Sequence, residues 1–379
     1  MELKLDVSKE YAIALEGGGA KGAYEVGVWK ALDEAGIKYN AVSGASVGAL
    51  NGAMMAMREL DKAVELWENI KFSQVMDVDD EVMKRIFEKE LGISDLRALA
   101  KHALGLLKEG GFDVSPLRKL LSEVIDEEKI MASDVNFFLV TFSLSDMKEL
   151  DIDVKTLKPG TLNDMLLASA YLPAFKREKL GGKFYSDGGL QNVVPLDSLI
   201  NRGYKDIIVV RIFGFGIEKR VKISKDITVT TIEPKTKLGY MLNFNAEQSK
   251  KDIMLGYFDA KRVLYGLYGE TYYIDRTWTE KEAYDVLSTL VTGYFERLGK
   301  KVSVRKLNEE VLRRMAKEVG AKEDYYDVFI KYIEKAAEYF KIPYFEIMTD
   351  EKIYNRVCAA RKNSGKKSVP RMFGFLPVE

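Results

Sequence analysis

Ser46 has the surroundings of a nucleophilic serine. Gly44, Ser46 and Gly48 form the pattern G-x-S-x-G within the stretch VSGASVGALNG. In hydrolases with this pattern, the serine lies at a sharp turn between a buried strand and a helix, which holds its hydroxyl at the helix N-terminus. The flanking residues fit, because YNAVSG is typical of a strand end and GALNGAMMAMREL has apolar residues at helical spacing. The pattern alone leaves open an ordinary serine in a turn of small residues.

A run of glycines follows an earlier apolar strand and opens a helix, in LEGGGAKGAYEVG. Gly17, Gly19 and Gly22 match the dinucleotide fingerprint G-x-G-x-x-G, but the acidic residue expected at the end of the next strand is absent from SGA. The same run, with Gly18, could instead present backbone N–H groups to an oxyanion at the positive end of a helix. A tight turn that needs glycine only for packing is the third interpretation.

A nucleophilic serine needs a base, and the chain has one histidine, His102. Hydrolases of the elbow type order their triad as serine, acid and histidine, and His102 does not follow an acid that could fill the second place. We interpret His102 as a helix-surface or lid residue and expect an aspartate to accept the proton directly. Asp187, in FYSDGGLQNVVP, follows a strand and precedes two glycines that let another loop approach. Asp-Gly-Gly is also an ordinary turn, which is the alternative.

Four segments together resemble the patatin-like phospholipases, which are acyl hydrolases with a Ser-Asp dyad. The segments are EGGGAKGAYEVGV, GASVGALNG, ASAYLPAFK and YSDGGLQNVVPL, in the order and rough spacing of that family. The resemblance also includes GGFDVSPLRKLL and covers about residues 10 to 275. It implies a three-layer α/β/α sandwich with a mixed central sheet.

The resemblance also implies roles for individual residues. Ser46 would be the nucleophile and Asp187 the base, with Gly44 and Gly48 forming the elbow. The oxyanion hole would lie in the glycine motif G-G-G-x-[KR]-G, whose residues here are Gly17, Gly18, Gly19, Lys21 and Gly22. Tyr171 and Leu172 replace the smaller residues that often precede the proline in this family, which affects the expected shape of the pocket.

The function expected from this resemblance is hydrolysis of acyl esters of phospholipids or lysophospholipids through an acyl-enzyme, with no metal and no cofactor. A catalytically silent lipid-binding or scaffold protein is the main alternative, and a dinucleotide-binding enzyme is a weaker one. Any contact with a membrane would be peripheral, we expect no nucleic-acid partner, and the sequence leaves the oligomeric state open.

The elements that must position these residues alternate between strand and helix. Strands are predicted in YAIAL, YNAVSG, VNFFLVTFSL, KDIIVVRIFG and DITVTTIEP. We expect an acyl hydrolase domain over residues 1–275, with residues 75–130 as a helical cover, and a helical region over residues 276–379. In that region, Thr279 and Glu282 predict a capping box, and an apolar stripe continues to Leu298.

Composition narrows the class of protein. The chain of 379 residues is 47% hydrophobic, and its 58 basic residues balance its 58 acidic ones, so no overall charge favours nucleic acid. A single cysteine, Cys358, excludes an internal disulfide.

No signal-peptide pattern or membrane-length apolar run is present, so we expect a soluble cytoplasmic protein. The last stretch, ARKNSGKKSVPRMFGFLPVE, is predicted to be either a solvated tail or a surface contact.

Overall fold

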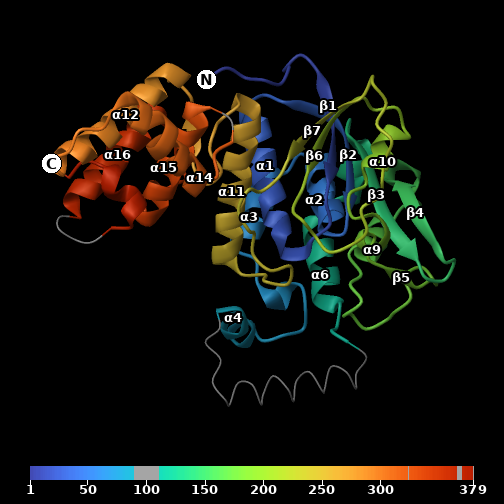
Figure 1. Ribbon diagram of the computed structural model, residues 1–379. Helices are drawn as coiled ribbons and strands as arrows, with labels where there is room; N and C mark the ends of the chain where they lie inside the picture. The colour runs from blue at the N-terminus through green and yellow to red at the C-terminus, as the bar shows by residue number, and fades with distance from the viewer. Residues whose placement is uncertain (89–110, 323, 365–368, 379) are drawn as a thin grey trace. The chain divides into compact units, whose positions relative to one another are not determined.

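The computed structural model describes residues 1–88, 111–322, 324–364 and 369–378. Two units divide the chain (Figure 1). One is Leu5–Leu264, and the other combines Tyr265–Glu379 with Met1–Lys4. The division therefore falls before the expected boundary at residue 275. His102 and the central part of the expected cover lie outside the described residues.

A seven-stranded mixed sheet forms the centre of the unit Leu5–Leu264. Its order is β4-β3-β2-β1-β6-β7, with β5 paired to β3. The five strands β1, β2, β3, β6 and β7 run parallel to one another, whereas β4 and β5 run antiparallel to β3. The bounds are β1 Glu10–Leu15, β2 Lys38–Ala45, β3 Asn136–Ser143, β4 Lys148–Asp153, β5 Tyr185–Ser186, β6 Asp206–Val210 and β7 Thr228–Ile232.

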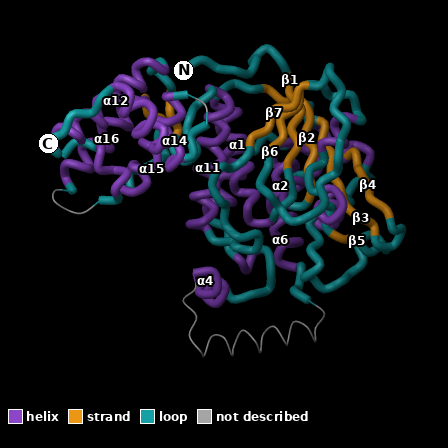
Figure 2. The backbone as a smooth tube through the Cα atoms, in the orientation of Figure 1, coloured by secondary structure: helices purple, strands orange, loops and turns teal. Residues whose placement is uncertain are grey.

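Helices cover both faces of this sheet, as Figures 1 and 2 show. On one face, Ala12 and Ala14 of β1 pack in a cluster with Leu199 of α10 (Leu196–Ile200). On the other face, α2 (Val47–Ala56) packs against β1, β2 and β3. The remaining helices of this unit are α1 Ala23–Glu34, α3 Leu60–Glu68, α4 Asp80–Glu88, α6 Ser115–Val124, α7 Glu127–Ala132, α8 Leu162–Ser169, α9 Gly189–Asn192 and α11 Ala246–Tyr265, with short 3-10 turns η1 Gly19–Gly22, η2 Phe72–Gln74 and η3 Val154–Thr156. The predicted sandwich of helices around a mixed sheet is confirmed.

Two local features differ from the sequence-based expectations. The helix predicted through the stretch after Ser46 ends at Ala56, because Arg58 takes a positive φ of 56° before α3 begins. Strand β4 was not predicted, since its sequence KELDID alternates weakly and carries charges. It pairs with β3 alone, and such an edge position tolerates polar side chains on both faces.

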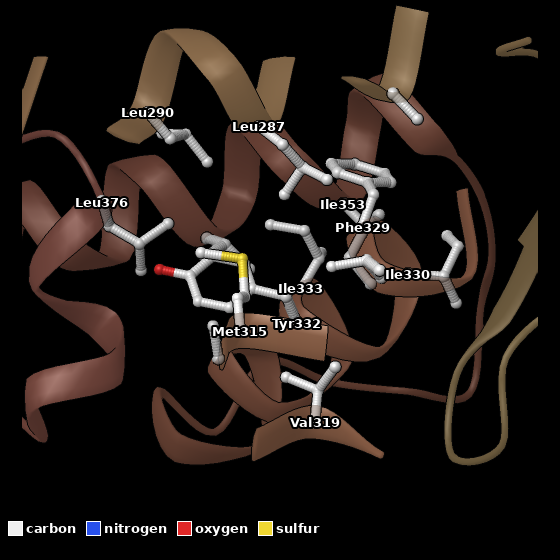
Figure 3. Packing of buried hydrophobic residues seen from close by; sticks show 14 of the residues in the cluster. Leu287, Leu290, Met315, Val319, Phe329, Ile330, Tyr332, Ile333, Ile353 and Leu376 are labelled. Carbon is white, nitrogen blue, oxygen red and sulfur yellow. The ribbon is translucent and has the colours of Figure 1, made fainter. Parts of the chain in front are cut away.

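The unit that contains Tyr265–Glu379 has a helical fold of its own. Its helices are α12 Glu280–Arg297, α13 Val304–Lys306, α14 Arg313–Val319, α15 Tyr325–Tyr339 and α16 Asp350–Asn363, with η4 Leu307–Leu312 and η5 Arg371–Phe375, and β8 Tyr273–Asp275 pairs in parallel with β9 Ile347–Thr349. Phe329, Ile333 and Leu287 lie in its aromatic-rich core (Figure 3). The structure therefore adds a short sheet to the expected helical region.

The ends of this helical unit test two sequence-based expectations. The capping box of α12 is present, because Thr279 and Glu282 exchange both hydrogen bonds. The apolar stripe ends earlier than expected, since Leu298 follows the helix and is largely exposed. The last stretch is not a solvated tail in its described part, because Phe373 and Leu376 are buried in the core.

None of the helices that the structure describes combines the length and apolar character needed to cross a membrane.

Candidate active site

Ser46 lies at the sharp turn between β2 and α2. Its backbone is strained, with φ 52° and ψ −124°, a region that residues other than glycine rarely adopt. Two glycines make the turn possible. A Cβ on Gly44 would lie 2.2 Å from the Gly48 carbonyl oxygen, and one on Gly48 would lie 2.5 Å from the Leu15 carbonyl oxygen. The strand, the turn and the helix thus pack too closely for any other residue at these two positions.

Asp187 meets Ser46 at the end of β5. The Ser46 hydroxyl donates to Asp187 Oδ2 at 2.5 Å, and the Gly189 amide donates to Oδ1 at 2.8 Å. Both side chains are buried, with only 5% of each residue exposed. Burial raises the pKa of Asp187 to about 6, although the hydrogen bonds from Ser46 and Gly189 oppose the shift. The carboxylate is therefore desolvated and held against a single hydroxyl.

Ser169, at the end of α8, connects the two candidate catalytic segments. Its hydroxyl accepts from the Ser46 amide at 3.0 Å and donates to the Val140 carbonyl at 2.7 Å. Its own carbonyl accepts from the Gly188 amide at 3.0 Å. In the sequence, Ser169 is in step with Leu162, Met165 and Leu166, a spacing that predicts only a place on the apolar face of a helix. A polar residue on such a face must find hydrogen-bond partners, and that was the signal available.

The glycine run lies next to the elbow, but its members differ in what their backbone amides do. The Gly17 amide donates to the Val193 carbonyl at 2.9 Å, so its hydrogen is not available to a second acceptor. Within the described residues, the Gly18 and Gly19 amides have no acceptor. Gly19 has φ +60° and lines the same pocket as Ser46. Of the predicted oxyanion-hole amides, those of Gly18 and Gly19 are free to receive a developing negative charge.

Lys21 and Gly22 of the same motif make contacts with neighbouring segments. The Lys21 ammonium donates to the Phe213 carbonyl at 2.6 Å, which ties the glycine loop to the loop after β6. A Cβ on Gly22 would lie 2.4 Å from a methyl group of Val47, so this glycine lets α1 start against α2. Both residues hold the loop in place.

A buried cluster of Asn51, Glu25 and Trp67 supports the glycine loop, and it was not predicted from the sequence. The Asn51 amide nitrogen donates to the Gly22 carbonyl at 2.9 Å and to the Glu25 carboxyl group at 2.7 Å. The Trp67 indole donates to the Asn51 oxygen at 3.0 Å. Complete burial raises the pKa of Glu25 well above its usual range. Neither Asn51 nor Glu25 belongs to a motif that sequence alone would single out.

A pocket with almost entirely apolar walls opens at Ser46. Its lining comes from α2, α3, α6 and the segment after α8. The apolar side chains among the lining residues are Val47, Leu50, Met54, Leu66, Trp67, Ile70, Val75, Leu117, Leu120, Leu121, Val124, Ile125, Ala170, Leu172, Phe175 and Phe244. Such walls favour a hydrocarbon chain over a polar ligand. Leu172, one of the two expected departures from the family pattern, is part of this lining.

A strained serine at a strand–helix elbow, hydrogen-bonded to a buried carboxylate, meets the geometric requirement for an activated nucleophile. The comparison with protein families agrees with this class. Residues 13–200 match the model of the patatin-like phospholipase family, so the chain carries a patatin-like phospholipase domain.

Curated relatives resemble the chain over part of its length. Patatin-like phospholipase domain-containing protein 7 of Rattus norvegicus is 26% identical over 208 residues, which make up 52% of this chain and 13% of that protein. Lysophospholipase nte1 of Aspergillus terreus is 50% identical over 48 residues, 13% of this chain and 3% of that protein. The chain thus spans only a small part of the length of these relatives.

Among solved structures, VipD from Legionella pneumophila is similar, with a TM-score of 0.42 and 14% identity over 97% of this chain and 90% of that chain.

Proposed function

We propose that this chain is a serine acyl hydrolase that cleaves acyl esters of phospholipids or lysophospholipids. The observation that carries the proposal is the 2.5 Å hydrogen bond from the Ser46 hydroxyl to Asp187, at the opening of an apolar pocket. The patatin-like phospholipase domain in residues 13–200 supports the lipid class, and one relative is named a lysophospholipase.

The first half of the proposed reaction forms an acyl-enzyme. Asp187 accepts the hydroxyl proton as Ser46 Oγ attacks the ester carbonyl carbon. Negative charge then develops on the carbonyl oxygen, and the free amides of Gly18 and Gly19 donate to it. Each donor of this kind typically lowers the barrier by about 3 kcal/mol. The intermediate collapses when the bond to the leaving alcohol breaks, and the proton on Asp187 passes to that alcohol.

The second half of the reaction regenerates the serine. Asp187 accepts a proton from water, the resulting hydroxide attacks the acyl carbon, and Ser46 leaves with that proton restored to its oxygen. The products are a free fatty acid and the deacylated alcohol. The apolar pocket holds the acyl chain during both steps, because its walls offer hydrocarbon contacts and few polar groups.

The proposal places this activity in the unit Leu5–Leu264, which contains the candidate dyad, the glycine loop and the whole lining of the pocket. A catalytically silent lipid-binding protein is the competing interpretation. The two predict opposite results with a fluorogenic acyl ester.

The test is hydrolysis of that ester by the parent chain and by Ser46→Ala. The parent should turn the ester over, and the variant should fall to the uncatalysed rate while its circular dichroism stays unchanged, because only one hydroxyl is removed. Equal turnover by both proteins would contradict the proposal. So would an inert parent chain that binds lipid.

A further inference from the structure

Large apolar side chains are exposed on two loops that follow the carboxyl ends of β6 and β7. Phe213, Phe215 and Ile217 are 50%, 79% and 54% exposed, and Tyr240 is 64% exposed. Phe213, Phe215 and Tyr240 line one shallow depression. We name these four residues the aromatic loop surface. Exposed apolar groups that gather in this way mark interaction sites.

Basic residues surround the aromatic loop surface. Loops 211–227 and 233–241 together carry seven Lys and Arg residues and three acidic residues, in a chain whose net charge is zero. One of the three, Asp226, forms an ion pair with Lys205 outside these loops. The two glutamates, Glu218 and Glu233, are both engaged in ion pairs within these loops. Arg220 and Lys237, by contrast, are exposed and have no ion pair among the described residues. The loops therefore present a net positive charge to whatever approaches them.

The aromatic loop surface is fixed directly to the candidate active site. Buried Glu16, at the end of β1, accepts from the backbone amides of Ile212, Phe213 and Gly214 at 2.7 to 3.1 Å. A Cβ on Gly214 would lie 1.7 Å from the Gly17 carbonyl oxygen, so the two loops touch through their backbones.

Two further bonds connect this surface to both halves of the site. The Lys21 ammonium holds the Phe213 carbonyl beside the glycine loop, and the Ile217 amide donates to the Gly189 carbonyl, two residues from Asp187. Phe213 is held at a positive φ of 49°. Because the Phe213 side chain is half exposed, packing in the core does not explain why its backbone is held in this strained conformation.

We propose that the aromatic loop surface docks on an anionic phospholipid surface. Phe213, Phe215, Ile217 and Tyr240 would enter the interface between headgroups and acyl chains, and the surrounding Lys and Arg side chains would meet lipid phosphates. Because the loop is bonded to the glycine loop and to the segment after Asp187, docking would place the opening at Ser46 next to the lipid. The idea that docking delivers lipid to Ser46 rests on the proposed function, but binding to the lipid surface does not require catalysis.

The first experiment measures vesicle binding by cosedimentation, using the Ser46→Ala chain so that no lipid is consumed. Vesicles of phosphatidylcholine mixed with phosphatidylglycerol should bind it. Adding Phe215→Ser and Ile217→Ser should weaken binding at least about tenfold, because two apolar side chains no longer enter the interface. The matched control is Val7→Ser, an exposed apolar residue before β1, at the opposite end of the parallel strands, which should leave binding unchanged.

A second pair of variants tests the charge. Arg220→Glu with Lys237→Glu should weaken binding to the anionic vesicles at least about tenfold. Added salt should weaken the binding of the parent in the same direction. Lys38→Glu, an exposed lysine at the start of β2, is the matched control and should weaken binding much less. Stronger binding to phosphatidylcholine alone than to the mixture would overturn the proposal.

The outcomes separate this proposal from the proposed function. If the Phe215→Ser, Ile217→Ser chain binds vesicles as its Val7→Ser control does, the docking proposal is wrong, whatever the ester assay shows. If that change instead converts a dimer to a monomer in native mass spectrometry and leaves vesicle binding intact, the surface is a protein interface and the proposal is also overturned. Loss of vesicle binding with unchanged hydrolysis of a monomeric ester would support docking.

Discussion

At the scale of single residues, the account depends on Asp187 acting as a base without histidine. A carboxylate is a weak base in water, and burial strengthens it by raising its pKa to about 6. Besides Ser46, the one hydrogen-bond partner of its side chain among the described residues is the Gly189 amide, which fixes its orientation toward Ser46. In the proposed mechanism, desolvation and alignment of this carboxylate take the place of the imidazole of a triad.

The raised pKa of Asp187 predicts how activity changes with pH. The base works only as the carboxylate, so kcat/KM should be level above about pH 7 and fall as the pH falls through about 6, approaching tenfold per unit. The measurement is a pH–rate profile on a monomeric ester. Full activity retained at pH 4 would contradict a base with this pKa.

Ser169 is predicted to be a positioning residue. Ser169→Ala removes the acceptor of the strained Ser46 amide and the donor to Val140, so kcat should fall about tenfold or more while KM changes little. The matched control is Ser143→Ala, a buried serine on β3 that is bonded to Asp146 and should leave both constants near the parent. A fall in thermal stability with unchanged kcat would mean that Ser169 serves only the fold.

At the scale of elements, the turn after β1 and the turn after β2 pack against each other and together form the candidate site. A Cβ on Gly17 would lie 3.1 Å from the Ala45 carbonyl oxygen and 3.3 Å from the Ser46 Cβ, so the two turns touch. Both follow parallel strands at the same edge of the sheet, which is where such sheets place their sites. The free amides of Gly18 and Gly19 are thereby held beside Ser46.

Gly18→Val tests whether this loop is an oxyanion hole. A Cβ at Gly18 would meet the flexible end of Ile212 at 2.7 Å, which can move, but a branched side chain would crowd the free amides. We expect about a 10²–10³-fold loss in kcat with a modest loss of stability. Gly293→Val is the control for the cost of valine at a glycine position, because Gly293 has the ordinary helical backbone of α12 and a Cβ there would lie 3.8 Å from the Arg297 side chain. Normal turnover by a folded Gly18→Val chain would place the hole elsewhere.

Prediction from sequence succeeded where a local pattern determines the structure. Strands β1, β2, β3, β6 and β7 are short apolar runs, and glycine marks each turn at the site. It failed where the determinant is a contact between distant segments. The Glu16 carboxylate accepts from amides about 200 positions further along the chain, and the Gly17 amide donates to the Val193 carbonyl. Neither contact can be predicted from the residues that flank Glu16 or Gly17. The edge strand β4 was missed because solvent exposure removes its apolar pattern.

At the scale of the whole molecule, the residues of the proposed reaction and of the proposed lipid docking all lie within the unit Leu5–Leu264. The other unit has its own core around Phe329 and Ile333, and Phe373 and Leu376 near the end of the described chain belong to that core. Its sequence carries none of the motifs on which the proposed reaction depends. The proposed reaction therefore assigns no catalytic residue to the second unit.

The most direct test of the central claim is the rate at which a fluorophosphonate probe labels the intact chain, with the site identified by mass spectrometry. We expect a single adduct on Ser46 in the parent and at near-parental rate in His102→Gln. Asp187→Asn, which keeps the size of the side chain but cannot accept the proton, should slow labelling about 10²–10⁴-fold. Labelling of another serine would contradict the account. So would a folded His102→Gln chain that no longer reacts while Asp187→Asn labels at the parental rate.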